Sequence, residues 1–203
     1  MSASVEKPFY ELRDALLEDV AAALERIRAD RTLLDVRSGL GETLLHWFAV
    51  EYREDIVKAL LDLGASVDPT NHFYSTPFAE AAQLQNQSMC SLLLKHGANV
   101  DPIDQNGQTP LMLAAFMGEA ARCRFLLKLG ASPTFTNSDG DSVLITAVRS
   151  GKIEVVEVIE VILKHLDSDT DINTQIDDLT ASMLAEIASD ITQLLQQRGL
   201  RKV

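Results

Sequence analysis

The stretch GQTPLMLAAFMG, residues Gly107 to Gly118, contains the start and the end of a short helix. Thr109 can cap a helix by accepting a hydrogen bond from a backbone N–H, and Pro110 fits the first helical turn. The apolar run then ends on Phe116 and Met117, where such a helix runs out. Whether these two side chains belong to a core depends on whether the stretch occurs once or is one of several copies.

The stretch is one of four copies with a constant period of 33 residues. The copies begin with TLLHWFA, TPFAEAA, TPLMLAA and SVLITAV, at Thr43, Thr76, Thr109 and Ser142. A second apolar segment follows in the first three copies and ends on glycines with the same period, Gly64, Gly97 and Gly130. A fixed period of this length predicts an array of stacked units that bury a shared core.

The best copy, GANVDPIDQNGQTPLMLAA followed by RFLL, resembles the ankyrin repeat, whose pattern is D-x-x-G-x-T-P-L-H-x-A-A, a leucine helix and G-A-x-V-N/D. The resemblance is clearest over residues 30–160. It implies an all-α solenoid of helix–turn–helix units joined by β-hairpin fingers, with helical caps. The expected single domain, 1–203, divides into a cap at 1–40, four repeats at 41–72, 73–105, 106–138 and 139–173, and a shortened capping repeat at 174–203.

Several residues depart from the ankyrin pattern. His46 is the only histidine at the motif position, where the family uses the ring to bond neighbouring backbone. Tyr74 replaces the hairpin glycine, so we predict a distorted turn there. Tyr52 and Gln85 replace a mid-repeat glycine that Gly118 and Gly151 keep.

The two ends of the array are atypical, as expected for capping units. Residues 8–29 predict an amphipathic helical pair, with apolar side chains turned inward at Leu12, Leu16, Leu17, Val20 and Leu24. Near the C-terminus, the second helix of the fourth repeat is expected to be about a turn longer. The acidic segment 167–178 lacks the spacing of a calcium loop, and we interpret it as a solvated loop.

Charge and cysteine content limit the possible functions. The 203-residue chain has a formal net charge of −12, which argues against non-specific binding of nucleic acid or of anionic membranes. An acidic chain suits a basic partner, although acidity also serves solubility. Cys90 and Cys123 lie one period apart and are expected to be buried thiols. Two isolated thiols and an N-terminus without a signal pattern predict a cytoplasmic protein.

No arrangement of residues in the sequence predicts catalysis. The histidines are isolated, and neither a nucleophile motif nor a glycine-rich phosphate loop is present. We therefore expect no enzyme activity, no cofactor and no metal site.

The resemblance also implies where a partner would bind. Ankyrin repeats most often use a concave surface formed by the fingers and the first helices. Relative to the motif threonine, exposed finger positions lie three, four and six residues before it, and exposed helix positions lie seven and eight after it. The partner-binding residues predicted in this way, with Tyr74 added, are Arg37, Leu40, Glu51, Thr70, His72, Phe73, Tyr74, Leu84, Ile103, Gln105, Asn106, Phe116, Met117, Ser138, Asp139 and Arg149.

Phe116 and Met117 fall on this surface, because Leu111, Ala114 and Ala115 already supply the inward contacts of their repeat. An apolar patch of this kind predicts a protein partner with an apolar ridge, bound by a chain that is a monomer when free. The rim of the surface is mainly acidic, which predicts basic flanks on that partner. The alternative is that these side chains fill gaps between repeats.

The expected function is protein binding, with inhibition of the partner as its sharper form. A bacterial immunity protein that neutralises a toxin enzyme is one alternative. An adaptor that localises another protein and uses the 167–178 loop as a second surface is another.

Overall fold

The computed structural model describes residues 3–150, 157–158, 161–162 and 165. The chain divides into two compact units, unit 1 at Met1–Asp104 and unit 2 at Gln105–Val203. The predicted acidic loop and C-terminal capping repeat, and most of the extended helix of the fourth repeat, lie outside the described residues.

Unit 1 begins with a helical cap. Helix α1 (Ala3–Glu18) and helix α2 (Val20–Ala29) pack together, and a short 3-10 helix, η1 (Arg31–Asp35), follows. The predicted helical pair is therefore present, but α1 begins five residues before the expected position 8. Its buried side chains are Phe9, Leu12 and Leu16.

Leu17 does not point inward as predicted, because its side chain is 51% exposed. A helix turns by about 100° per residue, so Leu17 lies off the face that carries Leu12 and Leu16. In α2 the buried residues are Ala23 and Ile27, whereas Val20 and Leu24 are half-buried.

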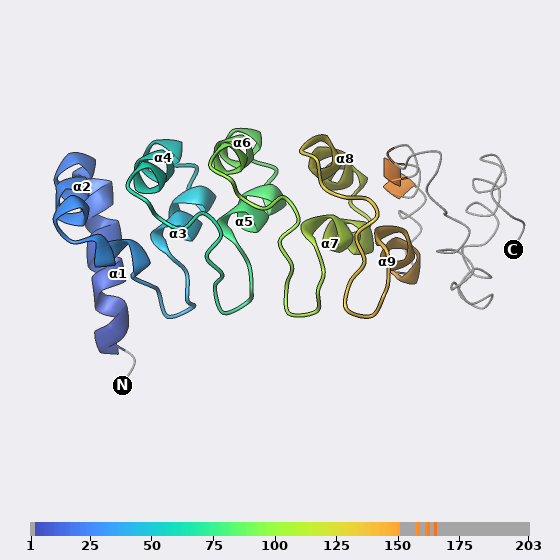
Figure 1. Ribbon diagram of the computed structural model, residues 1–203, viewed down its shortest axis with the longest axis horizontal. Helices are drawn as coiled ribbons and strands as arrows, with labels where there is room; N and C mark the ends of the chain where they lie inside the picture. Colours follow the sequence, from blue (N-terminus) through green and yellow to red (C-terminus); the bar gives the residue numbers. More distant parts are fainter. Residues whose placement is uncertain (1–2, 151–156, 159–160, 163–164, 166–203) are drawn as a thin grey trace, which may run out of the picture. The chain divides into compact units, whose positions relative to one another are not determined.

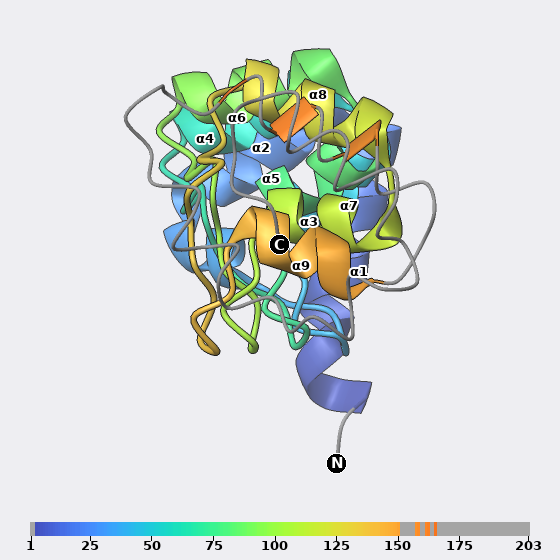
Figure 2. The same cartoon turned by 90° about the vertical axis from the view of Figure 1, so that its right-hand side faces the viewer.

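Two helix pairs complete unit 1: α3 (Leu44–Val50) with α4 (Glu54–Asp62), and α5 (Pro77–Gln83) with α6 (Gln87–Lys95). Helix α3 packs against α5, and α4 packs against α6. The loops that precede α3 and α5, which we call finger 1 (residues 36–42) and finger 2 (residues 69–75), extend away from α4 and α6 (Figure 1 and Figure 2).

Unit 2 contains α7 (Pro110–Met117), α8 (Ala120–Lys128) and α9 (Val143–Arg149). Helix α7 packs against both α8 and α9. The predicted caps are present at the motif positions: Thr76, Thr109 and Ser142 each accept a hydrogen bond from the backbone N–H three residues later, at 3.2–3.3 Å. Pro77 and Pro110 lie in the first turn of α5 and α7, as expected.

The fingers are tight turns rather than regular β-hairpins. Within the described residues there is no β-strand, and the only bridge joins Thr136 to Ser142, across finger 4 (residues 136–142). In finger 1 the Gly41 N–H donates to the Ser38 carbonyl oxygen at 2.9 Å, and in finger 4 the Gly140 N–H donates to the Asn137 carbonyl oxygen at 3.0 Å.

The distortion predicted at Tyr74 is wrong. The Tyr74 N–H donates to the Asn71 carbonyl oxygen at 3.1 Å, which is the same turn bond that the glycines make in fingers 1 and 4. Tyr74 achieves this with a φ of 60°, in the left-handed region that glycine adopts without strain. Tyr52 (φ 58°) and Gln85 (φ 54°) likewise keep the backbone of Gly118 (φ 78°).

Candidate functional site

The predicted partner-binding residues occupy the fingers and the ends of the first helices. In unit 1 they are Arg37, Leu40, Glu51, Thr70, His72, Phe73, Tyr74, Leu84 and Ile103; in unit 2 they are Gln105, Asn106, Phe116, Met117, Ser138, Asp139 and Arg149. All of them are exposed. Exposure is a condition for binding a partner, and the binding role itself stays a prediction.

The tips of fingers 1 and 2 present apolar side chains. Phe73 is 66% exposed, Tyr74 52% and Leu40 51%. The two tips are neighbours, because the backbone N–H of His72 donates to the carbonyl oxygen of Leu40 at 2.9 Å. A Cβ atom at Gly41 would lie 2.6 Å from the His72 ring, so the glycine leaves room for the histidine.

Finger 2 is held in shape by Asn71, a residue that the sequence analysis did not single out. Its side-chain oxygen accepts hydrogen bonds from the backbone N–H groups of Phe73 (2.9 Å) and Ser75 (3.1 Å). Ser38 in finger 1 and Asn137 in finger 4 make the equivalent pair of bonds. The sequence holds a signal for these three residues, because each lies five positions before the motif threonine or serine of its repeat and they follow the 33-residue period.

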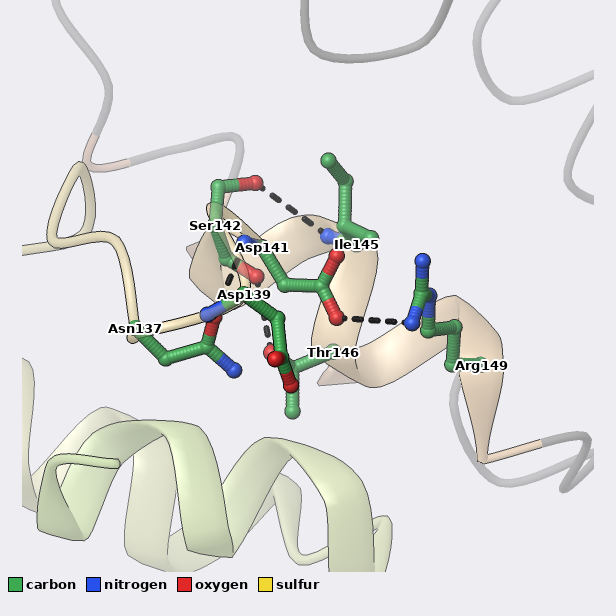
Figure 3. A network of polar contacts seen from close by, with 7 residues as sticks. All are labelled: Asn137, Asp139, Asp141, Ser142, Ile145, Thr146 and Arg149. Atoms are coloured by element: carbon green, nitrogen blue, oxygen red, sulfur yellow. Dashed lines mark hydrogen bonds and ion pairs between the residues drawn. The ribbon is translucent and has the colours of Figure 1, made fainter. Parts of the chain in front are cut away.

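Two cations predicted to face a partner also bond within the chain. One guanidinium nitrogen of Arg37 donates to the carbonyl oxygens of Gly41 and Thr70, both at 2.7 Å, and so ties finger 1 to finger 2. Arg149 forms an ion pair with the buried Asp141 at 3.0 Å (Figure 3). Sequence reasoning missed both internal contacts because they depend on the packing of the fingers.

His46 has the structural role that the resemblance implied. Its Nδ1 accepts the Thr43 backbone N–H at 3.1 Å, and Nε2 therefore carries the proton and donates to the Ser75 carbonyl oxygen at 3.0 Å. Burial lowers the pKa of His46, which favours the neutral ring. The ring thus joins the start of α3 to finger 2.

Glu80 is a second feature that sequence reasoning missed. It lies on α5, is half-buried, and accepts a hydrogen bond from the side-chain amide of Asn71 at 2.9 Å. Burial, and then the nearby charge of Glu42, raise the pKa of Glu80 to about 7. Among the described residues no cation pairs with Glu80, in contrast to the Asp141–Arg149 pair of unit 2.

In unit 2, the last two residues of α7, Phe116 and Met117, lie at the surface and not in the core. Leu111, Ala114 and Ala115 are fully buried, as predicted, while Phe116 is 43% and Met117 53% exposed. Leu113 is also 40% exposed and was not predicted as a surface residue. The signal was present, since α7 is apolar on all sides and only one side can face the core.

The described residues offer little for chemistry. They contain no group of three or more His, Cys, Asp or Glu side chains that could hold a metal ion. Cys90 and Cys123 are free thiols and fully buried, as predicted, and burial raises the pKa of each to about 12. Within the same part of the chain, no helix combines the length and apolar character that crossing a membrane requires.

The chain was also compared with known proteins. The family described as ankyrin repeats (3 copies) matches residues 16–104, 45–137 and 100–173, which overlap along most of the chain. No curated protein matches. Ankyrin repeats are generally protein–protein interaction modules and are typically not enzymes. With a family match over more than half its length and the repeated caps and fingers described above, the chain belongs to the ankyrin repeat family.

Proposed function

We propose that the chain is a non-catalytic module that binds a protein partner through its fingers and the exposed ends of its first helices. The family's general role supports this proposal. Exposed apolar side chains on both units support it further. Phe73 and Tyr74 supply them in unit 1, and Phe116 and Met117 supply them in unit 2.

One observation carries the proposal: finger 2 holds a tyrosine where the turn favours glycine. A bulky residue at positive φ costs free energy, roughly 1–2 kcal/mol. Tyr74 is 52% exposed, so burial of its ring within the chain offsets only part of that cost. Tyr52 and Gln85 share this positive φ, and the exposed pair of neighbouring aromatic side chains is what distinguishes finger 2. Phe73, the residue beside Tyr74, is exposed further still.

The charge distribution indicates the partner's chemistry. Residues 1–104 contain 17 Asp and Glu and 9 Lys and Arg, which gives unit 1 a formal charge of 9 − 17 = −8. Residues 70–94 carry only one of these charges, Glu80. The tip of finger 2 is therefore an uncharged, apolar region in an acidic unit, and it suits a partner with an apolar ridge and basic flanks.

The proposal extends to inhibition of that partner in the cytoplasm. A basic cleft on an enzyme would match the acidic surroundings of finger 2, and two buried free thiols suit a reducing compartment. Neutralisation of a toxin enzyme, as a bacterial immunity protein would perform it, is one version of this role. An adaptor that localises another protein is the alternative.

Affinity purification with mass spectrometry tests the proposal. The tagged chain is compared with the double variant Phe73→Ala and Phe116→Ala. The matched control is Leu17→Ala, which removes a comparably exposed apolar side chain from α1. We expect one protein to co-purify with the wild type and the control and to be lost from the double variant, whose helical circular dichroism stays unchanged. Hot-spot aromatics contribute about 2 kcal/mol or more each. Equal recovery with all three forms would contradict the proposed surface.

The partner's own activity separates the versions of the role. If stoichiometric addition of the chain abolishes that activity, the chain is an inhibitor. If the activity is unchanged while the complex forms, the adaptor role is favoured instead.

A further inference from the structure

Neighbouring fingers within a unit approach each other at a glycine. In unit 1, a Cβ atom at Gly41 would lie 2.6 Å from the His72 ring and 3.1 Å from the His72 backbone nitrogen. In unit 2, a Cβ atom at Gly107, in the loop before α7, would lie 2.5 Å from the Ser138 hydroxyl oxygen and 2.9 Å from the Ser138 backbone nitrogen. Non-bonded atoms do not pack this closely, and a backbone nitrogen cannot turn aside as a flexible side chain can. Both approaches therefore require a residue without a side chain.

This contact recurs at equivalent positions of the repeat. Gly41 and Gly107 each lie two positions before the motif threonine of their own repeat. His72 and Ser138 each lie four positions before the motif residue of the repeat that follows. In unit 1 the backbone hydrogen bond from the His72 N–H to the Leu40 carbonyl oxygen, at 2.9 Å, joins the same two fingers. The glycine thus sets how closely one finger can approach the next.

Finger 2 lacks this glycine, because the residue two positions before Thr76 is Tyr74. The φ of Tyr74, 60°, keeps its backbone close to that of Gly41, at 77°. Its Cβ atom therefore stands where Gly41 has none, and the Cβ atom carries a ring that is 52% exposed. The turn of finger 2 itself is undistorted, but finger 2 cannot accept another finger in the way that finger 1 accepts finger 2.

The division of the chain falls at the next step of the array. Unit 1 ends at Asp104 and unit 2 begins at Gln105. Gln105 lies four positions before Thr109, so it is the residue equivalent to His72 and Ser138. Two separate features, the missing glycine of finger 2 and the limits of the compact units, therefore coincide at one place in the repeat pattern.

We propose that Tyr74 interrupts the energetic coupling between successive repeats, so that unit 1 and unit 2 fold and unfold independently of each other. The stability of a repeat array is roughly the sum of the stabilities of its repeats and of the interactions between neighbours. One weak interaction therefore divides an array into separate cooperative units. The uncoupling is a property of the isolated chain, and it holds whether or not Tyr74 contacts a partner.

Urea unfolding followed by Trp47 fluorescence tests this proposal. Trp47 is the only tryptophan of the chain and lies on α3, so its emission reports on unit 1. The perturbation is Leu111→Ala, which removes a fully buried side chain from α7 in unit 2. We expect the Trp47 midpoint to stay unchanged in this variant, and this expectation is the same if unit 2 fails to fold.

The decisive comparison repeats Leu111→Ala in the Tyr74→Gly background. With the glycine pattern restored, the perturbation of unit 2 should reach unit 1 and lower the Trp47 midpoint by about 0.5 M urea or more. Tyr74→Ala, which keeps a Cβ atom, should respond as the wild type does. Leu93→Ala, in α6 of unit 1, is the positive control and should lower the Trp47 midpoint in every background.

Two results would overturn the proposal. If Leu111→Ala lowers the Trp47 midpoint in the wild-type background, the units are coupled despite Tyr74. If the midpoint stays unchanged in the Tyr74→Gly background as well, Tyr74 is not what separates the units. Neither result involves a partner, so failure of this proposal can be told from failure of the proposed function.

Discussion

At the scale of single residues, the backbone of Tyr74 lowers the stability of the protein, while its exposed ring is proposed to contact the partner. Its left-handed backbone costs the folded state roughly 1–2 kcal/mol, which a glycine would avoid. A glycine also raises the conformational entropy of the unfolded chain, and this cancels part of the gain. We therefore expect Tyr74→Gly to stabilise the protein by about 0.5–1 kcal/mol in urea unfolding. The same substitution should weaken binding of the partner if the ring contacts it.

The control for this prediction is Tyr74→Ala, which removes the ring but keeps a Cβ atom in the left-handed turn. It should give no gain in stability and the same loss of binding. Equal unfolding free energies for the glycine and alanine variants would show that the backbone of Tyr74 is not strained.

Glu80 makes a second prediction at the residue scale, on how stability depends on pH. Its pKa is raised from 4.5 to about 7 in the folded protein, so between these values the folded state holds a proton that the unfolded state has released. The contribution of Glu80 to stability therefore decreases as the pH rises from about 4.5 to 7. We expect Glu80→Gln, which mimics the neutral acid, to raise the Tm at pH 8 and to change it little at pH 4.5.

Thermal unfolding followed by circular dichroism measures this difference. Glu51→Gln serves as the control, because it removes the same charge from an exposed position. An identical Tm change at both pH values for Glu80→Gln would contradict the raised pKa.

At the scale of the elements, the fingers depend on bonds between repeats. Arg37 joins the carbonyl oxygens of Gly41 and Thr70 and so holds finger 1 against finger 2. We expect Arg37→Met to lower the free energy of unfolding by about 1–2 kcal/mol, since hydrogen bonds from a charged donor contribute more than neutral ones. Chemical denaturation measures the loss.

The control is Lys7→Met, which removes an exposed ion pair with Glu11 and should lower the free energy of unfolding by less than about 1 kcal/mol. A loss of that small size for Arg37→Met would mean that the tie does not hold the fingers.

The elements also show how far the sequence could be read. The 33-residue period predicted the helix starts at Thr76, Thr109 and Ser142, because a capping side chain acts on its own helix and its effect is local. It could not predict that Arg37 bonds finger 2 or that Glu80 is half-buried near Glu42, because those contacts form only when one repeat stacks on the next. The distortion expected at Tyr74 was wrong for a related reason: Asn71 and the neighbouring finger hold the turn in the geometry of glycine.

At the scale of the whole molecule, the net charge of −12 makes a prediction about the partner's association. Opposite charges on two proteins accelerate their encounter, and salt screens this attraction over a Debye length of about 8 Å at 0.15 M ionic strength. If the partner's binding face is basic, as proposed, its association rate should fall at least several-fold between 50 mM and 500 mM NaCl. The dissociation rate should change little, because it depends mainly on buried apolar contacts such as those of Phe73. Surface plasmon resonance at several salt concentrations measures both rates. An association rate that is independent of salt would contradict a basic partner, and it would leave the apolar fingers as the basis of recognition.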